Sequence, residues 1–302
     1  MLTLTHHEKM KKTILLFSII TIIVSCNSPK EQAIPKGYKI IYDEGIYVEE
    51  FDSTHTSSNR YTADNRTYLK GNKLTYDYYY QDLSGNKHKF QEVEGASELD
   101  SRERAKAWFL VNIDSLKDKT IHQVVLTVIG TNSWWEENNP DYNQTVISYK
   151  YPQLNGHQNF SSSTGVIENE KNVWIHPPRD KLFRILEINP FPFIQAPYEI
   201  GNKWEWSMKI GEAWGDSRWK TWEESIENSY EYEITAKREI STRLGDLECY
   251  EIKARASSSI GETHLTAFFH RDIGFVKLDY TNIDATKTVL ELVKFEKTEQ
   301  LE

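Results

Sequence analysis

Apolar and polar residues alternate along most of the C-terminal third of the chain. The alternation is found in six stretches, at residues 204–210, 229–240, 247–257, 262–270, 275–282 and 288–295. Turn-forming residues such as Leu244-Gly245-Asp246 separate neighbouring stretches. A period of two is typical of half-buried strands, and closely spaced strands with no helix between them indicate an antiparallel meander. We therefore predict an antiparallel β-meander, or half-barrel, as a C-terminal domain over residues 199–297.

The N-terminal half contains shorter patterns of the same kind. Residues 38–51 have two apolar stretches around Asp43-Glu44-Gly45, which predicts a strand, a turn and a second strand. Residues 68–82 predict another hairpin with Gly71-Asn72 as its turn, because a Gly-Asn pair lies between apolar stretches. Two further strands are predicted, at 121–129 and 146–151.

One segment of the N-terminal half has helical spacing instead. Between residues 100 and 118, apolar side chains recur three or four residues apart, at Ala105, Phe109, Ile113 and Leu116. This spacing places them on one face of a helix. We therefore predict one amphipathic helix here, and a fold that is mainly β overall, in the α+β class.

The sequence changes character over residues 174–198, which hold five of the nine prolines. Proline cannot donate to a β-ladder, so we predict an apolar crossing segment with one strand at 182–188. Its end divides an N-terminal β-rich region, residues 37–198, from the C-terminal domain.

The first 26 residues predict export. A lysine-containing start precedes the apolar stretch at 13–24, which is followed by Ser25 and Cys26. A positive start, a short apolar core and a small residue before the cleavage point are the marks of a secretory signal. We predict a signal peptide over residues 1–25, and a polar tether over residues 26–36.

Residues 23–26, Ile-Val-Ser-Cys, resemble the lipobox of bacterial lipoproteins. That resemblance implies cleavage before Cys26 and lipid on its sulfur, and it places the protein in the cell envelope, at the outer membrane of a Gram-negative bacterium. Several acyl chains together hold a protein firmly at a membrane. A lipidated Cys26 leaves Cys249 without a disulfide partner, because the chain has only two cysteines.

The charge of the chain excludes one class of partner. The formal net charge is −9, and loss of residues 1–25 removes more lysine than glutamate. Nucleic-acid binding needs a basic surface, so we expect no nucleic-acid partner.

Three motifs of the C-terminal third resemble a family of secreted Gram-negative domains labelled TapB-like, whose function is poorly defined. They are Gly-Asn-Lys-Trp at 201–204, the turn and strand at 242–252, and Ile-Gly-Phe-Val-Lys at 273–277. Where the family often has Ala-Pro, this chain has His-Arg-Asp at 270–272. The resemblance implies a half-open antiparallel sheet whose concave face holds an apolar ligand or a partner strand. It supplies no catalytic residue.

The nine tryptophans suggest a carbohydrate site, because sugar rings stack on exposed aromatic faces. The candidate ligand-binding residues are Trp134 and Trp135 in a polar loop, and Trp204 and Trp206 on one face of a strand; Trp214, Trp219 and Trp222 form a third cluster. The alternative is that these rings fill the core, since large aromatic side chains usually pack.

His176 and Arg179 flank two prolines and form a second candidate ligand site. A guanidinium binds a carboxylate or phosphate in a bidentate way, which suggests an anion site. The alternative is structural: Arg179 pairs with a carboxylate of the protein, and His176 caps a loop.

We find no catalytic signature in the sequence, no metal-binding motif and no cofactor motif. We therefore expect a non-enzymatic, membrane-anchored lipoprotein that acts as a binding or envelope-scaffolding module, with no cofactor and no metal. One alternative is a surface glycan-binding protein, or a hydrolase, that uses the tryptophan clusters. Another is a carrier of lipid or another apolar molecule, which predicts an apolar hollow beneath the C-terminal sheet.

Overall fold

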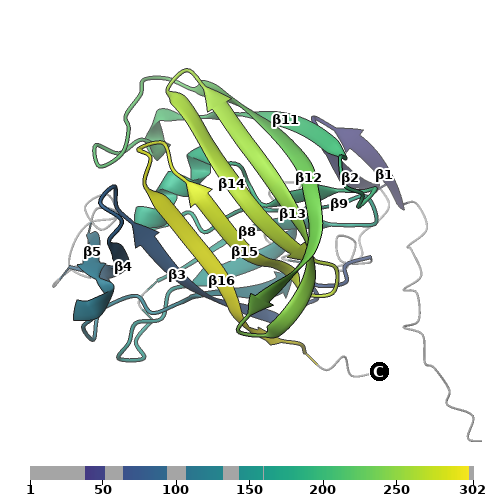
Figure 1. Cartoon of the computed structure of the whole chain (residues 1–302). Coiled ribbons are helices and arrows are strands. Elements are labelled where there is room, and N and C mark those ends of the chain that lie inside the picture. Colours follow the sequence, from purple (N-terminus) through teal and green to yellow (C-terminus); the bar gives the residue numbers. More distant parts are fainter. Residues whose placement is uncertain (1–37, 52–63, 94–106, 132–142, 159, 299–302) are drawn as a thin grey trace, which may run out of the picture. The chain divides into compact units, whose positions relative to one another are not determined.

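The computed structural model describes residues 38–51, 64–93, 107–131, 143–158 and 160–298 (Figure 1). In these residues the N-terminal strands are β1 Tyr38–Asp43, β2 Ile46–Phe51, β3 Lys73–Gln81, β4 Lys87–Glu92, β5 Trp108–Asn112, β6 Val124–Gly130, β7 Thr145–Lys150, β8 Ser161–Glu168, β9 Asn172–Ile175 and β10 Phe193–Gln195. The C-terminal strands are β11 Lys203–Ile210, β12 Ile226–Thr242, β13 Gly245–Ser258, β14 Gly261–His270, β15 Gly274–Thr281 and β16 Lys287–Glu296. The described helices are short 3-10 turns, η3 Ile113–Ser115, η4 Lys181–Ile188 and η5 Glu212–Trp214. The mainly antiparallel β class predicted from the sequence is confirmed.

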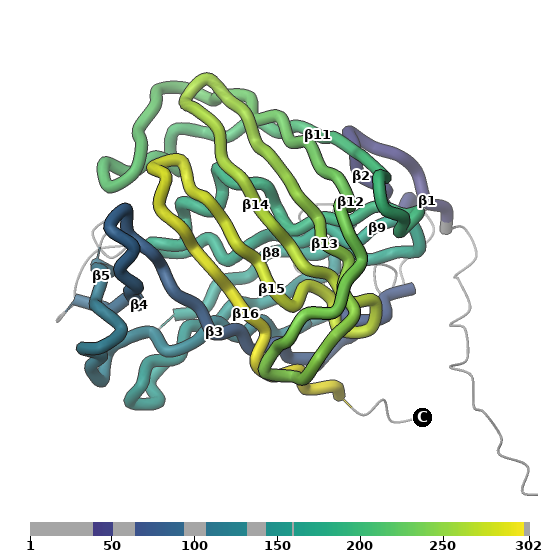
Figure 2. The backbone as a smooth tube through the Cα atoms, viewed as in Figure 1, coloured from purple at the N-terminus to yellow at the C-terminus, as the bar shows by residue number. Residues whose placement is uncertain are grey.

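A single sheet contains all the described strands except the β1–β2 hairpin. Its order is β10-β9-β8-β7-β6-β3-β16-β15-β14-β13-β12-β11, with β4 and β5 attached beside β3. Every pair in it is antiparallel. The predicted C-terminal meander is confirmed as β11 to β16. Pairing of β3 with β16 joins the regions 37–198 and 199–297 into one curved, nearly closed sheet (Figures 1 and 2).

The two faces of the C-terminal strands differ in chemistry, as their alternation predicts. Along β11 the burial alternates residue by residue, with Trp204, Trp206 and Ile210 buried. On the exposed face, charged side chains form cross-strand ion pairs, such as Arg255 with Glu231 and Glu262. The apolar side faces inward and the charged side faces solvent.

The proline-rich segment between β9 and β11 fills the inside of this sheet. Phe191 and Phe193 are fully buried, and their ring centroids lie 5.6 Å from Trp206 and 5.7 Å from Trp204. Under β11 and β12, the space where an apolar hollow was expected is therefore filled by the described part of the chain itself.

The strand predicted at residues 182–188 was also wrong, since this stretch is the 3-10 helix η4. Its buried side chains include Leu182, Phe183, Ile185 and Leu186. That spacing suits a helical turn, which satisfies backbone hydrogen-bonding groups locally.

The helix predicted at residues 100–118 was wrong for the part that the structure describes. Residues 108–112 form strand β5 against β4, and η3 follows. Residues 100–106 lie outside the described residues. The sequence Trp-Phe-Leu-Val-Asn has strong β-propensity, and the edge of β4 offers it a ladder of hydrogen bonds.

The hairpin predicted at residues 68–82 is a turn followed by the single strand β3. The turn is held by a buried carboxylate, because Glu168 accepts hydrogen bonds from the backbone N–H groups of Thr67 and Tyr68. The hairpin predicted at residues 38–51 is confirmed as β1 and β2.

The β1–β2 hairpin contacts both end strands of the sheet, β10 and β11, and we call the region between these end strands the seam. Figures 1 and 2 show the hairpin beside β9 and β11. The Gly45 carbonyl accepts a hydrogen bond from Gln195 of β10 at 2.6 Å, and a Cβ on Gly45 would lie 2.4 Å from the Cβ of Trp206 on β11. The backbone N–H of Tyr47 donates to Asn172 at 2.7 Å. The hairpin therefore bridges both ends of the sheet.

Candidate functional site

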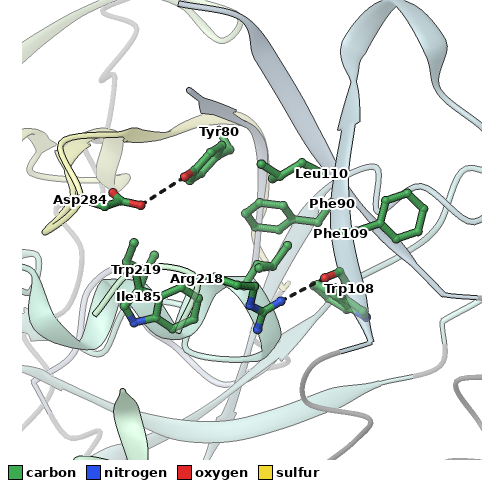
Figure 3. Close-up of a pocket in the computed structure, with 10 residues that line it drawn as sticks. Tyr80, Phe90, Trp108, Phe109, Leu110, Ile185, Arg218, Trp219 and Asp284 are labelled. Carbon is green, nitrogen blue, oxygen red and sulfur yellow. Dashed lines mark hydrogen bonds between the residues drawn. The ribbon is translucent and has the colours of Figure 1, made fainter. Parts of the chain in front are cut away.

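A cavity of about 360 Å³ opens at one end of the sheet, and we call it the aromatic pocket (Figure 3). The end of β3, the pair β4–β5, helix η4, the β11–β12 connection and the β15–β16 turn all contribute to it. Its lining residues are Tyr80, Phe90, Trp108, Phe109, Leu110, Leu182, Ile185, Arg218, Trp219 and Asp284. Seven of these ten side chains are purely apolar or carry only an indole N–H, so the pocket is predominantly apolar.

The base of the pocket is built on a rigid aromatic cluster. Phe90 is buried, and its ring lies 4.7 Å from Phe183 and 5.2 Å from Tyr78 between centroids. The Tyr78 hydroxyl accepts from the Phe90 backbone N–H and donates to the Ile121 carbonyl. This cluster fixes β4 against η4, so the pocket is preformed by core packing.

Arg218 joins two walls of the pocket. Its Nη1 donates to the Trp108 carbonyl oxygen at 3.1 Å, and its Nε and Nη2 form a bidentate pair with Asp216 at 2.9 and 2.7 Å. Burial alone raises the pKa of Asp216, but the Arg218 hydrogen bonds outweigh it and the net pKa is lowered. The guanidinium charge is thus matched by a carboxylate outside the lining.

The opposite wall carries a hydroxyl and a carboxylate. The Tyr80 hydroxyl donates to Asp284 Oδ2 at 3.4 Å, and Asp284 Oδ1 accepts from the Thr286 backbone N–H at 3.1 Å. Burial, together with the negative charge of Asp284, raises the pKa of Tyr80 to about 12. The phenol therefore stays protonated at neutral pH. Figure 3 shows this pair across the pocket from Arg218 and Trp108.

The mouth of the pocket leaves apolar surface in contact with solvent. Phe109 and Leu110 of β5 are 44% and 39% exposed. Exposing apolar area costs roughly 25 cal/mol per Å², and these two side chains are available for contact with a molecule in the pocket.

Trp204 and Trp206, two of the predicted ligand residues, are buried inside the sheet. Trp204 stacks on Tyr232 with centroids 5.3 Å apart, and Trp206 stacks on Tyr230 at 4.5 Å. The Trp206 indole N–H donates to the Tyr232 hydroxyl. These contacts support the packing alternative, because a sugar platform requires an exposed ring.

His176 and Arg179 lie together, as the motif predicts, but both side chains already interact with other groups of the protein. Arg179 lies 3.4 Å from the buried carboxylate of Glu187 and 3.3 Å from Nδ1 of His176. Burial and the nearby guanidinium lower the pKa of His176 to about 3, so the imidazole is uncharged at neutral pH. This geometry supports the structural alternative for both residues.

The other predicted positions contribute less to the site. Trp134, Trp135 and Cys26 lie outside the described residues. Cys249 is buried, and burial raises the pKa of its thiol to about 11, so it is an inert core residue. Over the described ranges, no cluster of three or more His, Cys, Asp or Glu side chains could hold a metal ion. The described helices are also too short or too polar to cross a membrane.

Sequence reasoning did not identify the aromatic pocket. Of its residues, only Trp219 belonged to a predicted ligand cluster. One feature of the sequence does point to this region. The connection at 211–225 is long and carries both tryptophan and arginine between two regular strands. Loops with such side chains often carry binding residues.

Comparisons with known proteins identify likenesses of fold. No protein-family model matches the sequence, and no curated protein matches it. A Bacteroides fragilis protein, described as a candidate exported protein with a YmcC-like fold, superposes with a TM-score of 0.41 at 11% identity, over 76% of this chain and 97% of its own. A candidate lipoprotein of Parabacteroides distasonis gives 0.42 at 11% identity over the same shares. The hypothetical lipoprotein YmcC of Escherichia coli gives 0.30 at 8% identity, over 77% of this chain and 87% of its own.

Proposed function

We propose that this protein is an exported lipoprotein, anchored to the outer membrane through lipid on Cys26, that binds a small apolar ligand in the aromatic pocket. It acts as a non-enzymatic binding module. The pocket is the observation that carries the proposal, because its shape and lining are those of a ligand site.

Three properties of the pocket support ligand binding. Its volume of about 360 Å³ falls within the range of roughly 300–1,000 Å³ that is usual for small-molecule sites. Its walls come from five separate parts of the chain, and core packing holds them in place. Its few polar groups, Arg218, Tyr80 and Asp284, stand at defined positions among apolar side chains, which is how such sites orient a ligand.

The anchor is supported by the sequence alone. Residues 13–24 are apolar, and the lipobox motif ends at Cys26. Eleven residues lie between Cys26 and β1 at Tyr38, so the tether is short and keeps the folded part of the chain near the membrane. The resemblance of residues 199–297 to TapB-like domains belongs to the same proposal, since it implies a sheet-based module with no catalytic residue.

Ligand capture in the native envelope tests this function. The full-length protein is expressed in a Gram-negative host and purified in polymer-bounded lipid discs, which avoid detergent in the pocket. Small molecules that co-purify are then identified by mass spectrometry. A matched variant, Leu110→Trp, places an indole in the pocket from a side chain already 39% exposed.

The control variant is Leu83→Trp, which adds the same indole at a turn residue that is 74% exposed and outside the lining. We expect an apolar molecule that is retained by wild type and by Leu83→Trp, and depleted in Leu110→Trp. Equal recovery from all three proteins would mean that the molecule comes from the surrounding lipid, and the proposed function would fail.

A further inference from the structure

We infer that the aromatic pocket selects an uncharged amphiphile with a terminal hydroxyl, and that it discriminates against the fatty acid of the same chain length. This inference rests on the proposed function and specifies the class of ligand. The inference depends on which charged side chains of the pocket already pair with groups of the protein, and on which can still interact with a ligand.

The positive charge of Arg218 is already satisfied. Asp216 accepts from Nε and Nη2 in the bidentate geometry that a ligand carboxylate would need, and Nη1 donates to the Trp108 carbonyl. The Asp216 side chain is only 12% exposed, whereas that of Arg218 is 31% exposed, so the carboxylate is the more enclosed partner of the pair. A ligand acid would have to displace a carboxylate that is held by the same loop, and Arg218 therefore gives it little attraction.

The other arginine on this side is also engaged. Arg184 donates to the Ala213 carbonyl, and its guanidinium lies 5.4 Å over the ring of Trp214. Its neighbour Ile185 lines the pocket, whereas Arg184 does not. It adds no free cation to the lining.

Asp284 carries the other charge among the residues that line the pocket. Its hydrogen bonds come from uncharged donors, Tyr80 and the backbone and hydroxyl of Thr286, and among the residues that the structure describes no cation pairs with it. The Tyr80 bond is long, at 3.4 Å, compared with about 2.7 Å for a good O–H···O bond. A carboxylate accepts several hydrogen bonds. A hydroxyl on a ligand can therefore donate to Asp284 beside Tyr80.

The Asp284 carboxylate repels a ligand that ends in a carboxylate. Two negative charges in a site that is partly closed to water interact far more strongly than in bulk solvent. An apolar chain that ends in a carboxylate meets this repulsion, while the matching alcohol gains a hydrogen bond.

Decanol and decanoate test the inference as a matched pair. Each is titrated by calorimetry into the full-length protein in lipid discs at neutral pH, and the heat measured with Leu110→Trp discs is subtracted to remove partition into lipid. We expect decanol to bind at least tenfold more tightly than decanoate. Asp284→Asn keeps an acceptor for Thr286 and removes the charge, so it should reduce that preference several-fold.

The control is Asp279→Asn, which removes a half-exposed carboxylate of β15 outside the lining and should leave the preference unchanged. Decanoate that binds as tightly as decanol, or an Asp284→Asn variant with unaltered preference, would overturn the inference and leave the proposed function intact. If neither probe binds wild type more than Leu110→Trp, the proposed function itself fails.

Discussion

Arg218 donates a hydrogen bond from Nη1 to the carbonyl oxygen of Trp108 at 3.1 Å, across 110 positions of sequence. This bond ties the β11–β12 connection to the edge strand β5. Because the two segments form neighbouring walls of the aromatic pocket, the spacing between those walls depends on it. The bidentate pair with Asp216 fixes the direction from which the guanidinium approaches.

Replacing Arg218 with lysine should therefore open the pocket. A lysine cannot bond Asp216 in a bidentate way and reach Trp108 at the same time. We expect the free energy of unfolding to fall by about 1 kcal/mol, the usual net value of such bonds, and decanol binding to weaken several-fold. Arg255→Lys is the matched control, since Arg255 bridges two exposed glutamates and such surface pairs contribute little. Equal losses in the two variants would contradict the role of Arg218.

The buried Glu187 predicts how stability depends on pH. Burial raises the pKa of Glu187 from its ordinary 4.5 to about 7, although Arg179 partly opposes the shift. The folded state thus binds this proton more tightly than the unfolded state does. Its stabilising contribution is complete below pH 4.5 and is lost as the pH rises through about 7. Burial raises the pKa of Glu168 in the same direction.

Urea unfolding of wild type and Glu187→Gln at several pH values between 4.5 and 7 checks this account. An amide does not titrate, so the variant should lose less stability than wild type as the pH rises. The control is Glu205→Gln, a neutralisation on the exposed face of β11, which should follow the wild-type curve. If Glu187→Gln also runs parallel to wild type, Glu187 does not titrate in this range.

Gly45 tests whether the β1–β2 hairpin closes the seam of the sheet. Its φ is +97°, and a Cβ would lie 2.4 Å from the Cβ of Trp206. Gly45→Ala should therefore lift the hairpin from the seam and speed hydrogen exchange at Tyr47, whose amide donates to Asn172. Gly245→Ala is the control, because φ there is +106° but nothing lies within 4 Å. Similar exchange in both variants would mean that backbone strain alone matters.

Cys26 carries the anchor prediction. Cys26→Ala, expressed in a Gram-negative host, should lose acyl labelling and leave the membrane fraction, since the lipid is attached to its sulfur. Cys249→Ala is the matched control, because Cys249 is buried in the core and should not affect labelling. If Cys26→Ala stays membrane-bound with unchanged labelling, the lipobox interpretation is wrong.

The C-terminal meander could be predicted because local and tertiary preferences agree there. Along β11 to β16 the alternation of apolar residues matches the buried face, and turns such as Thr242–Gly245 fix the register through short-range hydrogen bonds. Each strand also pairs with its neighbours in sequence. Little information from distant parts of the chain is needed to place these strands.

The segments that were predicted wrongly either pair with residues far away in sequence or lie in an unusual environment. Phe109, Ile113 and Leu116 have helical spacing, yet β4 pairs with residues 108–112, and all three side chains are partly exposed. Tertiary pairing thus overrode the local pattern. Leu182 and Ile188 look like the ends of a strand, but the segment lies inside the sheet, where it forms a 3-10 helix.

The aromatic pocket could not be derived from the sequence for the same reason. Tyr80, Trp108, Ile185, Arg218 and Asp284 come from five separate parts of the chain, and only the closure of the sheet brings them together. The motifs that attracted attention were more local. Trp204 and Trp206 are conspicuous because aromatic rings fill the interior of the sheet, where they stabilise the fold.

Methyl NMR gives the most direct test that the pocket binds an apolar molecule. Decanol is added to the methyl-labelled full-length protein in lipid discs, and the signals of Leu110, Leu182 and Ile185, which line the pocket, are compared with that of Ile200, which is 64% exposed elsewhere. We predict saturable shifts at the three lining residues with one common Kd, and none at Ile200. Shifts that grow without saturation, or that are as large at Ile200 as at Ile185, would contradict the account.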